Sequence, residues 1–454
     1  MDIPENELEI CLSVMQRIAD SHGTIPRTDR FNSLISKIYR EGRRHDKQAE
    51  KARVVGQDRA VKASTGMVQI QRDAVAPAHA LLAPPSAPIR VLNEPETCYV
   101  CKQDFTEVHF FYHLLCPTCA AYNYTMRSLS TDLTGRTALV TGGRVKIGHQ
   151  MVLRLLRDGA RVIVTTRFPK AAAMRLHSEP DSAQWLHRLQ LYGLDLRNIP
   201  AVEAFAEHLT ATESSLEIII HNAAQTIRRP QGFYNELLAQ EQRALEALPP
   251  EARKVVAQAS NMALVETSAS LAVKDVLPLD RYADHEERAD SRDVNSWLLR
   301  LDDVSAPELV EVQLVNSIAP FVLNARLKAL MLRSPHERRF IVNVSAMEGQ
   351  FSRHKTVYHP HTNMAKAALN MMTRTSGADY AKDNIYMTSV DTGWVTDENP
   401  TPKRERNQQE NAFFAPLDIV DGMARIYHPV ADGLNNPATP HFGIFLKDYA
   451  PCPW

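Results

Sequence analysis

The stretch TALVTGGRVKIGHQMVLRLLRDGARVIVTTR, residues 137–167, decides the fold. It begins with a short β-rich run, breaks at Gly142 and Gly143, and resumes after Gly148 as a helix with apolar residues every three to four positions. The helix is expected to stop at Gly159, and a second β-branched run follows. Strand, glycine loop, helix and strand in this order are typical of the first half of a dinucleotide-binding unit, where a helix N-terminus and free backbone N–H groups meet a pyrophosphate.

The length and composition of the chain indicate a globular protein with more than one domain. It has 454 residues, 44% hydrophobic and 23% charged, and a formal net charge of -1. This charge gives no overall attraction for nucleic acid or an anionic membrane. The chain opens without a signal-peptide pattern and contains no run of about 18 apolar residues. We therefore expect a cytoplasmic protein with neither membrane nor nucleic acid as a partner.

Four of the six cysteines fall in one short segment, as C-x2-C, fourteen residues, and C-x2-C. This spacing lets four thiolates converge tetrahedrally from two tight turns, as in zinc ribbons and treble clefs. We predict a structural zinc ion in a module at residues 97–125. Redox chemistry or two disulfides are the alternatives, and the absence of a secretory signal disfavours both. The predicted metal ligands are Cys98, Cys101, Cys116 and Cys119.

The rest of the chain divides by its patterns. Residues 1–72 are predicted to form a helical N-terminal region whose basic stretch is a solvated arm or, alternatively, a docking site for a nucleic acid or an acidic partner. A Pro- and Ala-rich linker is predicted at 73–96. From residue 130 to 454, strand and helix patterns alternate, which predicts an α/β fold: a Rossmann-type doubly wound parallel sheet with helices on both faces. Beyond the two strands within 137–167, strands are expected at 189–194, 216–221, 340–344, 385–390 and 442–446.

Three short motifs are TGGRVKIG at 141–148, HNAA at 221–224 and DTGWVT at 391–396. Through them the chain from about residue 133 onward resembles the short-chain dehydrogenase/reductases, whose corresponding motifs are TGxxxGxG, NNAG and PGxxxT. In that family the PGxxxT region seats the nicotinamide amide. Asp195 is similar to its adenine-contacting aspartate. The positions that the resemblance assigns to cofactor binding are Thr141, Gly142, Gly143, Ile147, Gly148, Asp195, Leu196, Asn222, Ala223, Lys366, Gly393, Val395 and Thr396.

The resemblance also implies catalytic positions. Asn316 matches the asparagine that holds a water in the proton relay, Ser345 the serine that polarises the carbonyl, and Lys366 the lysine of YxxxK. Thr362 occupies the position of the tyrosine that donates or takes the hydroxyl proton. Tyr358 follows Ser345 at a spacing typical of the family but precedes the lysine by eight residues, about 12 Å along a helix. The lysine match is the firmer one and nominates Thr362.

The missing phenol leaves the proton donor open, because an aliphatic hydroxyl is a far weaker acid. The loop before Thr362 is longer than usual and can fold Tyr358, His359 or His361 over the site. Pro360 favours a helix that begins beside His361 and leaves Tyr358 outside. The donor is therefore predicted to be Tyr358, a loop histidine, or Thr362 with a water molecule.

Two further departures bear on the cofactor. Lys146 replaces the middle glycine of the loop, which hinders close backbone approach but adds a cation near phosphate. The second strand ends in Arg167, where an NAD-type unit has an acidic residue for the ribose 2′-hydroxyl. With Arg144 and Arg167 as clamps on a 2′-phosphate, a contact of about 1.5 to 3 kcal/mol favours NADP(H) over NAD(H). The alternative is that both arginines face solvent.

An insertion at about 226–300 lies between HNAA and Asn316. The 93 residues between Asn222 and Asn316 exceed the few tens usual in the family. The insertion is predicted to be a lid, a surface for a protein partner, or packing in a homo-oligomer.

Two functions are therefore predicted from the sequence. The first is an NADP(H)-dependent oxidoreductase acting on a small-molecule carbonyl or alcohol. The alternative is a catalytically weak or inactive NADP(H)-binding regulatory or scaffold protein that binds partners through its zinc module, N-terminal region and insertion.

Overall fold

The computed structural model describes residues 3–21, 28–72, 90–257, 282–283, 287–288, 290, 292–352 and 354–454. The chain divides into two compact units. One holds residues 1–61 with 92–94, and the other holds residues 62–91 with 95–454. Most of the predicted linker, residues 73–89, lies outside the described residues.

The first unit is helical, as its apolar patterns predicted. Its helices are α1 (Glu5–Asp20) and α2 (Asp29–Ala63), the latter running into the second unit. Helix α1 has no buried residue, and Asp58 is the buried residue of α2. The Asp58 carboxylate accepts hydrogen bonds from the backbone N–H groups of Asn93 at 2.8 Å and Glu94 at 3.1 Å. These bonds compensate the burial of a charged group.

The second unit begins with α3 (Gly66–Arg72) and the cysteine module. The module comprises β1 (Arg90–Thr97), β2 (Asp104–Val108) and α4 (Pro117–Met126), with residues 92–94 of β1 belonging to the first unit. The linker prediction is wrong for residues 90–96, because they form β1 and pair antiparallel with β2. Pro95 is tolerated there because it lies in the register irregularity between Val91 and Glu96.

An eight-stranded sheet forms the centre of the second unit, in the order β12-β11-β10-β9-β6-β3-β4-β5. All neighbours are parallel except β11 and β12. The strands are β3 (Thr137–Thr141), β4 (Arg161–Thr166), β5 (Leu189–Gly193), β6 (Ile218–His221), β9 (Arg339–Ser345), β10 (Ile385–Asp391), β11 (Phe445–Lys447) and β12 (Ala450–Cys452). The predicted strands are confirmed, and β12 is additional. The chain runs outward from β3 to β5 and returns at β6, so the switch point where such sheets bind ligands lies between β3 and β6.

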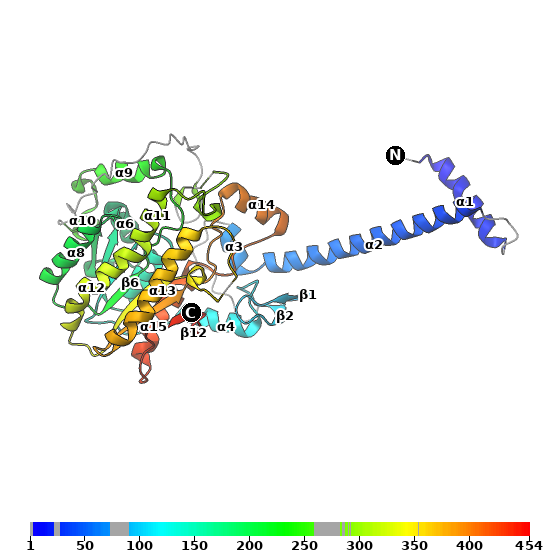
Figure 1. Cartoon of the computed structure of the whole chain (residues 1–454). Helices are drawn as coiled ribbons and strands as arrows, with labels where there is room; N and C mark the ends of the chain where they lie inside the picture. Colours follow the sequence, from blue (N-terminus) through cyan, green and yellow to red (C-terminus); the bar gives the residue numbers. More distant parts are fainter. Residues whose placement is uncertain are drawn as a thin grey trace. The chain divides into compact units, whose positions relative to one another are not determined.

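Helices cover both faces of this sheet (Figure 1). One face carries α5 (Lys146–Arg157), α6 (Pro169–His177) and α15 (Ile419–Asn435), and the other carries α8 (Ile199–Thr212), α12 (Ala319–Leu332) and α13 (Pro360–Ala381). Successive residues of β3 pack into the hydrophobic clusters on opposite faces of the sheet. Ala138 and Val140 pack on the α5 side, and Leu139 packs on the α8 side. The doubly wound architecture is therefore confirmed.

The insertion adds short elements, and its residues 255–257 lie at the β5 edge of the sheet. Its described elements are η2 (Gln231–Tyr234), α9 (Asn235–Gln242), η3 (Leu245–Ala247), α10 (Pro250–Lys254), β7 (Tyr282–Ala283) and β8 (Glu287–Arg288). The Leu191 N–H donates to the Val255 carbonyl at 2.8 Å, and the Ala257 N–H donates to the Leu191 carbonyl at 2.9 Å. Part of the insertion thus continues the sheet beyond β5.

The remaining elements are short helices that connect the strands and the longer helices. They are α7 (Ser182–Trp185), η1 (Leu186–Arg188), η5 (Ser296–Leu298), α11 (Ala306–Gln313), the π-helix η6 (Leu314–Ile318), η7 (Met347–Gly349) and α14 (Thr401–Asn411). Among the described helices, none combines the length and the apolar character needed to cross a membrane.

Candidate functional site

The turn after β3 leaves no space for a side chain at its glycine positions. A Cβ atom on Gly148 would lie 2.1 Å from the Gly142 carbonyl oxygen and 2.4 Å from Asn222 Nδ2. Gly142 itself has a φ of 73°, in the left-handed region that favours glycine. The Asn222 amide donates to the carbonyl groups of Thr141 at 3.2 Å and Gly142 at 3.0 Å. The glycine loop and the HNAA motif are thus joined by hydrogen bonds next to the N-terminus of α5.

Lys146, which stands where the family has a glycine, adopts a backbone conformation that favours glycine. Its φ of 54° lies in the left-handed region, which costs a non-glycine residue about 1 to 2 kcal/mol. Lys146 also lines the cavity beside this turn. Strained backbone of this kind is concentrated at functional sites.

A cavity of about 980 Å³ runs along the carboxyl ends of the strands. Thr141 and Gly143 lie behind its wall. The Thr141 hydroxyl accepts a hydrogen bond from the Ala223 N–H at 3.1 Å, and a Cβ on Gly143 would meet Val164 at 2.6 Å. The predicted cofactor residues that line the cavity are Gly142, Arg144, Lys146, Ile147, Gly148, Arg167, Asp195, Leu196, Asn222, Ala223, Lys366, Gly393, Val395 and Thr396.

Two arginines and two aromatic rings meet at one end of the cavity. The guanidinium groups of Arg144 and Arg167 lie 5.5 and 5.3 Å from the ring centroid of Phe168, and Arg167 lies 4.4 Å from that of Tyr234. All four residues line the cavity. Sequence reasoning missed Phe168, although it directly follows Arg167, and Tyr234, which the insertion supplies.

The nearby carboxyl group of Asp195 is held by an arginine. Burial alone would raise its pKa, but hydrogen bonds from Arg197, the shortest at 2.5 Å, outweigh burial and lower the pKa. Asp195, which lines the cavity, is therefore ionised at neutral pH.

Ser345, Thr362 and Lys366 gather at the other end of the cavity. The Ser345 and Thr362 side chains are buried, and neither hydroxyl oxygen has a hydrogen-bond partner among the residues that the structure describes. Buried polar atoms normally have partners. Lys366 Nζ donates to the carbonyl oxygen of Val344 at 2.9 Å, and burial lowers the pKa of Lys366 to about 8 against the opposing pull of Glu348.

Asn316 belongs to the π-helix η6, and both polar atoms of its side chain bond to the backbone of one residue, Gln225. Its Oδ1 accepts from the Gln225 N–H at 2.6 Å, and its Nδ2 donates to the Gln225 carbonyl at 3.1 Å. Asn316 does not line the cavity, whereas Gln225 and Val315 do. The Asn316 side chain therefore fixes the backbone that follows HNAA, and its role in holding a water stays a prediction.

The loop before α13 divides the candidate proton donors. Tyr358 is half-buried, lines the cavity and lies outside α13, which begins at Pro360 as expected. The His359 ring also lines the cavity and stacks on Trp297, with centroids 3.9 Å apart. His361 is buried away from the cavity wall, with Nε2 3.7 Å from a carboxylate oxygen of Glu308. His361 is therefore a packing residue.

Two residues that line the cavity, Asp391 and Tyr99, had no role assigned from the sequence, although Asp391 is the first residue of DTGWVT. Asp391 ends β10 in register with Ser345 at the end of β9, and burial raises its pKa to about 6. Lys447 Nζ lies 3.8 Å from the Asp391 carboxylate. Tyr99 reaches the cavity from the cysteine module. Its position between two predicted metal ligands concealed this role.

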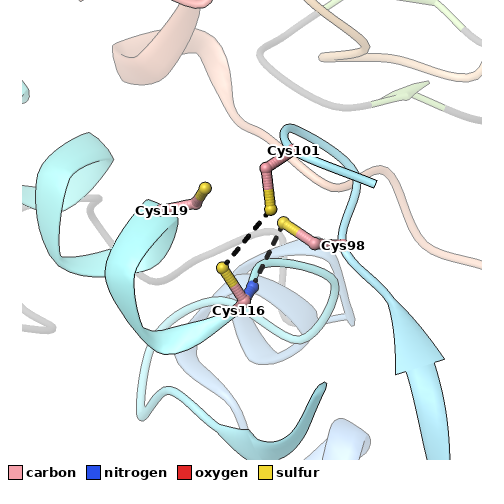
Figure 2. A group of neighbouring side chains, drawn as sticks. All are labelled: Cys98, Cys101, Cys116 and Cys119. Carbon is pink, nitrogen blue, oxygen red and sulfur yellow. Dashed lines mark hydrogen bonds between the residues drawn. The ribbon is translucent and has the colours of Figure 1, made fainter. Parts of the chain in front are cut away.

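The four predicted metal ligands converge (Figure 2). Their Sγ atoms all lie within 4.8 Å of one another, and those of Cys101 and Cys116 are 3.7 Å apart. A tetrahedral zinc site with bonds of about 2.3 Å needs sulfur atoms about 3.8 Å apart. A disulfide needs about 2.05 Å, and all four cysteines are free. The donor set and geometry therefore fit a four-thiolate zinc site.

The cysteine module is fixed to the sheet domain through α15. The Arg127 guanidinium, just after α4, makes a bidentate contact with the Asp418 carboxylate at 2.7 and 2.9 Å. Asp418 caps the N-terminus of α15. The module therefore packs against the sheet domain.

Comparison with known proteins identifies the family. A family model described as short chain dehydrogenase matches residues 136–245. The uncharacterized protein R665 of Acanthamoeba polyphaga mimivirus is 33% identical over 350 residues, 73% of this chain and 71% of that protein. Human dehydrogenase/reductase SDR family member 13 is 37% identical over 111 residues, 24% of this chain and 28% of that protein. The chain belongs to the short-chain dehydrogenase/reductase family.

Solved structures resemble this short-chain dehydrogenase/reductase at low identity. An NADPH-bound carbonyl reductase from chicken fatty liver is 18% identical, covers 71% of this chain and 100% of its own, and has a TM-score of 0.44. A short chain dehydrogenase from Burkholderia cenocepacia in complex with NADP is 18% identical, covers 70% of this chain and 97% of its own, and has a TM-score of 0.46.

Proposed function

We propose that this short-chain dehydrogenase/reductase is an NADP(H)-dependent oxidoreductase that interconverts a small-molecule carbonyl compound and its alcohol. One observation carries the proposal: the glycine turn and the Ser345, Thr362 and Lys366 side chains line the same cavity. Such a cavity can hold a dinucleotide along the strand ends and a small molecule beside the hydroxyl groups.

The cofactor residues are proposed to act in two ways, by bringing the backbone close to the pyrophosphate and by placing positive charge near the 2′-phosphate. The turn from Gly142 to Gly148 brings backbone close to a pyrophosphate at the N-terminus of α5. Arg144 and Arg167 give a 2′-phosphate two cations, which supports NADP(H) over NAD(H). The bound NADPH supplies the hydride.

The proton is proposed to come from α13. The unpartnered hydroxyl groups of Ser345 and Thr362 hold the carbonyl oxygen by hydrogen bonds. A Lys366 ammonium with a pKa of about 8 is a far better acid than a threonine hydroxyl. It gives a proton to the Thr362 hydroxyl or to a water molecule as that group passes its own proton to the oxygen. Lys366 is left as a neutral amine that recovers its proton from solvent. The Tyr358 phenol, in the same cavity, is the second source.

We also propose that the cysteine cluster holds one structural zinc ion. Four thiolates fill a tetrahedral coordination sphere, so such a site holds structure without binding substrate. Elemental analysis of freshly purified reduced protein tests this directly, with about one zinc per chain expected.

The test of the enzymatic function is turnover of NADPH with a panel of aldehydes and ketones. We expect turnover with at least one class of carbonyl and a drop of about 100-fold or more in Ser345→Ala and Lys366→Met. Tyr358→Phe separates the two proton sources, because it lowers kcat only if the phenol is the donor. NADPH affinity is measured for each variant, so that lost binding is not taken for lost catalysis.

A second function is favoured by one residue, Thr362, which replaces the phenol of the family. In this case the protein binds NADP(H) as a ligand and engages partners through its other regions. Tight NADPH binding without turnover on the panel, together with turnover gained in Thr362→Tyr, would support this second function and overturn the first.

A further inference from the structure

Tyr99 connects the cysteine cluster to the cavity. It lies between Cys98 and Cys101 in the sequence CYVC, and its side chain lines the cavity. The Tyr99 hydroxyl oxygen accepts a hydrogen bond from the backbone N–H of Trp394 at 2.8 Å. Trp394 belongs to the loop DTGWVT, residues 391–396, which resembles the nicotinamide seat of the family. A residue of the predicted metal turn therefore supports this loop directly.

The loop is packed closely against its supports at Gly393. Gly393 has a φ of 76°, and a Cβ atom there would lie 2.5 Å from Leu417 Cδ1 and 3.4 Å from the Tyr99 hydroxyl oxygen. Because the loop has little space to shift, the position of the Tyr99 hydroxyl bears on the position of the Gly393–Trp394 backbone.

A second route joins the other cysteine pair to the same glycine. The Asn123 amide donates to the carbonyl oxygen of Cys119 at 2.7 Å and accepts from Arg425 Nη2 at 2.6 Å. Arg425 Nε lies 3.5 Å from the position of a Cβ atom on Gly393. Each CxxC turn is thus connected to this loop. Tyr99 directly follows Cys98, and Asn123 links Cys119 to Arg425.

We propose that Tyr99 is a positioning residue for the nicotinamide end of the cofactor site, and that metal loading of the cysteine cluster controls cofactor affinity through it. The inference rests on the proposed NADP(H) function. A tetrahedral metal fixes the CYVC turn, whereas four free thiols at this spacing do not. Loss of the metal releases Tyr99 and with it the Trp394 N–H, so the seat of the nicotinamide loses its support. By linkage, bound NADPH raises the affinity of the cluster for metal.

The experiment compares two ligands by isothermal titration calorimetry. NADPH has a nicotinamide, and adenosine 2′,5′-bisphosphate shares only the adenosine and 2′-phosphate end. Both are titrated into the zinc-loaded and the chelator-treated forms of the unchanged protein and of Tyr99→Phe. Tyr124→Phe is the matched control, since Tyr124 lies in the same module and packs its ring on Phe110 and Phe111.

Removing one hydrogen bond predicts about a 3- to 10-fold weaker NADPH complex in Tyr99→Phe and in chelated protein. Affinity for adenosine 2′,5′-bisphosphate and all affinities of Tyr124→Phe stay within twofold. Chelation weakens NADPH binding less in Tyr99→Phe than in the unchanged protein. In a second readout, NADPH slows zinc transfer to a chromogenic chelator, and adenosine 2′,5′-bisphosphate does not.

Several results would overturn the inference. Equal losses for both ligands indicate general destabilisation instead of positioning, and unchanged NADPH affinity in Tyr99→Phe removes the role of Tyr99. If chelation unfolds the module, the zinc-loaded Tyr99→Phe protein still decides the question. Zinc-loaded protein that fails to bind NADPH at all refutes the proposed function, and the inference with it. NADPH binding that is unaffected by Tyr99→Phe and by chelation refutes the inference but leaves the proposed function standing.

Discussion

Thr362 and Lys366 lie one turn apart on α13, and both side chains line the cavity into which Ser345 also faces. Where the family has a phenol next to its lysine, this chain has a buried hydroxyl without a described partner. The acidity of the site is therefore expected to reside in Lys366, whose pKa burial lowers to about 8.

The buried hydroxyl groups give the first prediction. Thr362→Val keeps the shape of the side chain but removes its hydroxyl, so we expect kcat to fall by about 10² to 10⁴ while NADPH affinity holds. Thr362→Ser, which retains a hydroxyl, should keep most of the activity. Steady-state kinetics and calorimetry on the three proteins check this. Equal activity in the valine and serine variants would contradict a role for this hydroxyl.

The second prediction concerns pH. The folded-state pKa of Lys366 lies below its ordinary value of 10.5, so its ammonium form is lost as the pH rises through about 8. The rate of carbonyl reduction at saturating NADPH should fall above this pH, and the rate of alcohol oxidation should rise. A profile of kcat against pH shows the inflection. An inflection that persists in Lys366→Met belongs to another group.

Cofactor preference gives the third prediction. Arg167→Asp should weaken NADPH by about 10-fold or more and change NADH affinity far less, because one charge-assisted contact to the 2′-phosphate is replaced by repulsion. Arg326→Ala is the control, since its guanidinium pairs with Glu203 on an exposed surface. Fluorescence titration decides the outcome, and equal affinities of the unchanged protein for both cofactors would contradict the clamp.

The glycine turn gives the fourth prediction. Gly148→Ala places a Cβ atom 2.1 Å from the Gly142 carbonyl oxygen, so the turn must open and NADPH binding should fall below detection. Gly232→Ala is the matched change, since its nearest neighbour would lie 3.7 Å away, and it should bind normally. Circular dichroism on both variants separates lost binding from lost folding.

The metal gives the fifth prediction. A structural zinc ion can contribute on the order of 10 kcal/mol to the fold of a small module, so Cys116→Ser should make residues 90–127 sensitive to protease. Cys11→Ser is the control, since Cys11 is exposed on α1. Limited proteolysis with mass spectrometry locates the cuts. Identical digestion patterns for the two variants would contradict a structural metal.

The sequence predicted the sheet well because each strand carries its own signal. The buried parallel strand Ile218–His221, for example, begins with three consecutive isoleucines, and β-branched residues favour this geometry. The strand β1 was missed because its sequence, RVLNEPET, is polar and contains a proline. Its pairing with β2 creates a strand that local propensity does not favour.

The candidate site was predictable only where a motif marks it. Ser345 and Lys366 were found through short sequence patterns, and the cavity brings them together. Tyr99 and Tyr234 had no such signal, because each reaches the cavity through packing between segments far apart in the chain. Asp391 lies in the DTGWVT motif, but the motif gives this residue no role. His361 was nominated by its position in the sequence, but the local turn at the start of α13 directs it toward Glu308.

The central claim is hydride transfer in this cavity, and isotope transfer tests it most directly. NADPH carrying deuterium at both C4 positions is incubated with the protein and a panel of carbonyl compounds, and the alcohols are analysed by mass spectrometry. The account predicts one deuterium on the former carbonyl carbon with the unchanged protein and none above background with Ser345→Ala. No deuterated alcohol from any compound on the panel, with protein shown to bind NADPH, would contradict it.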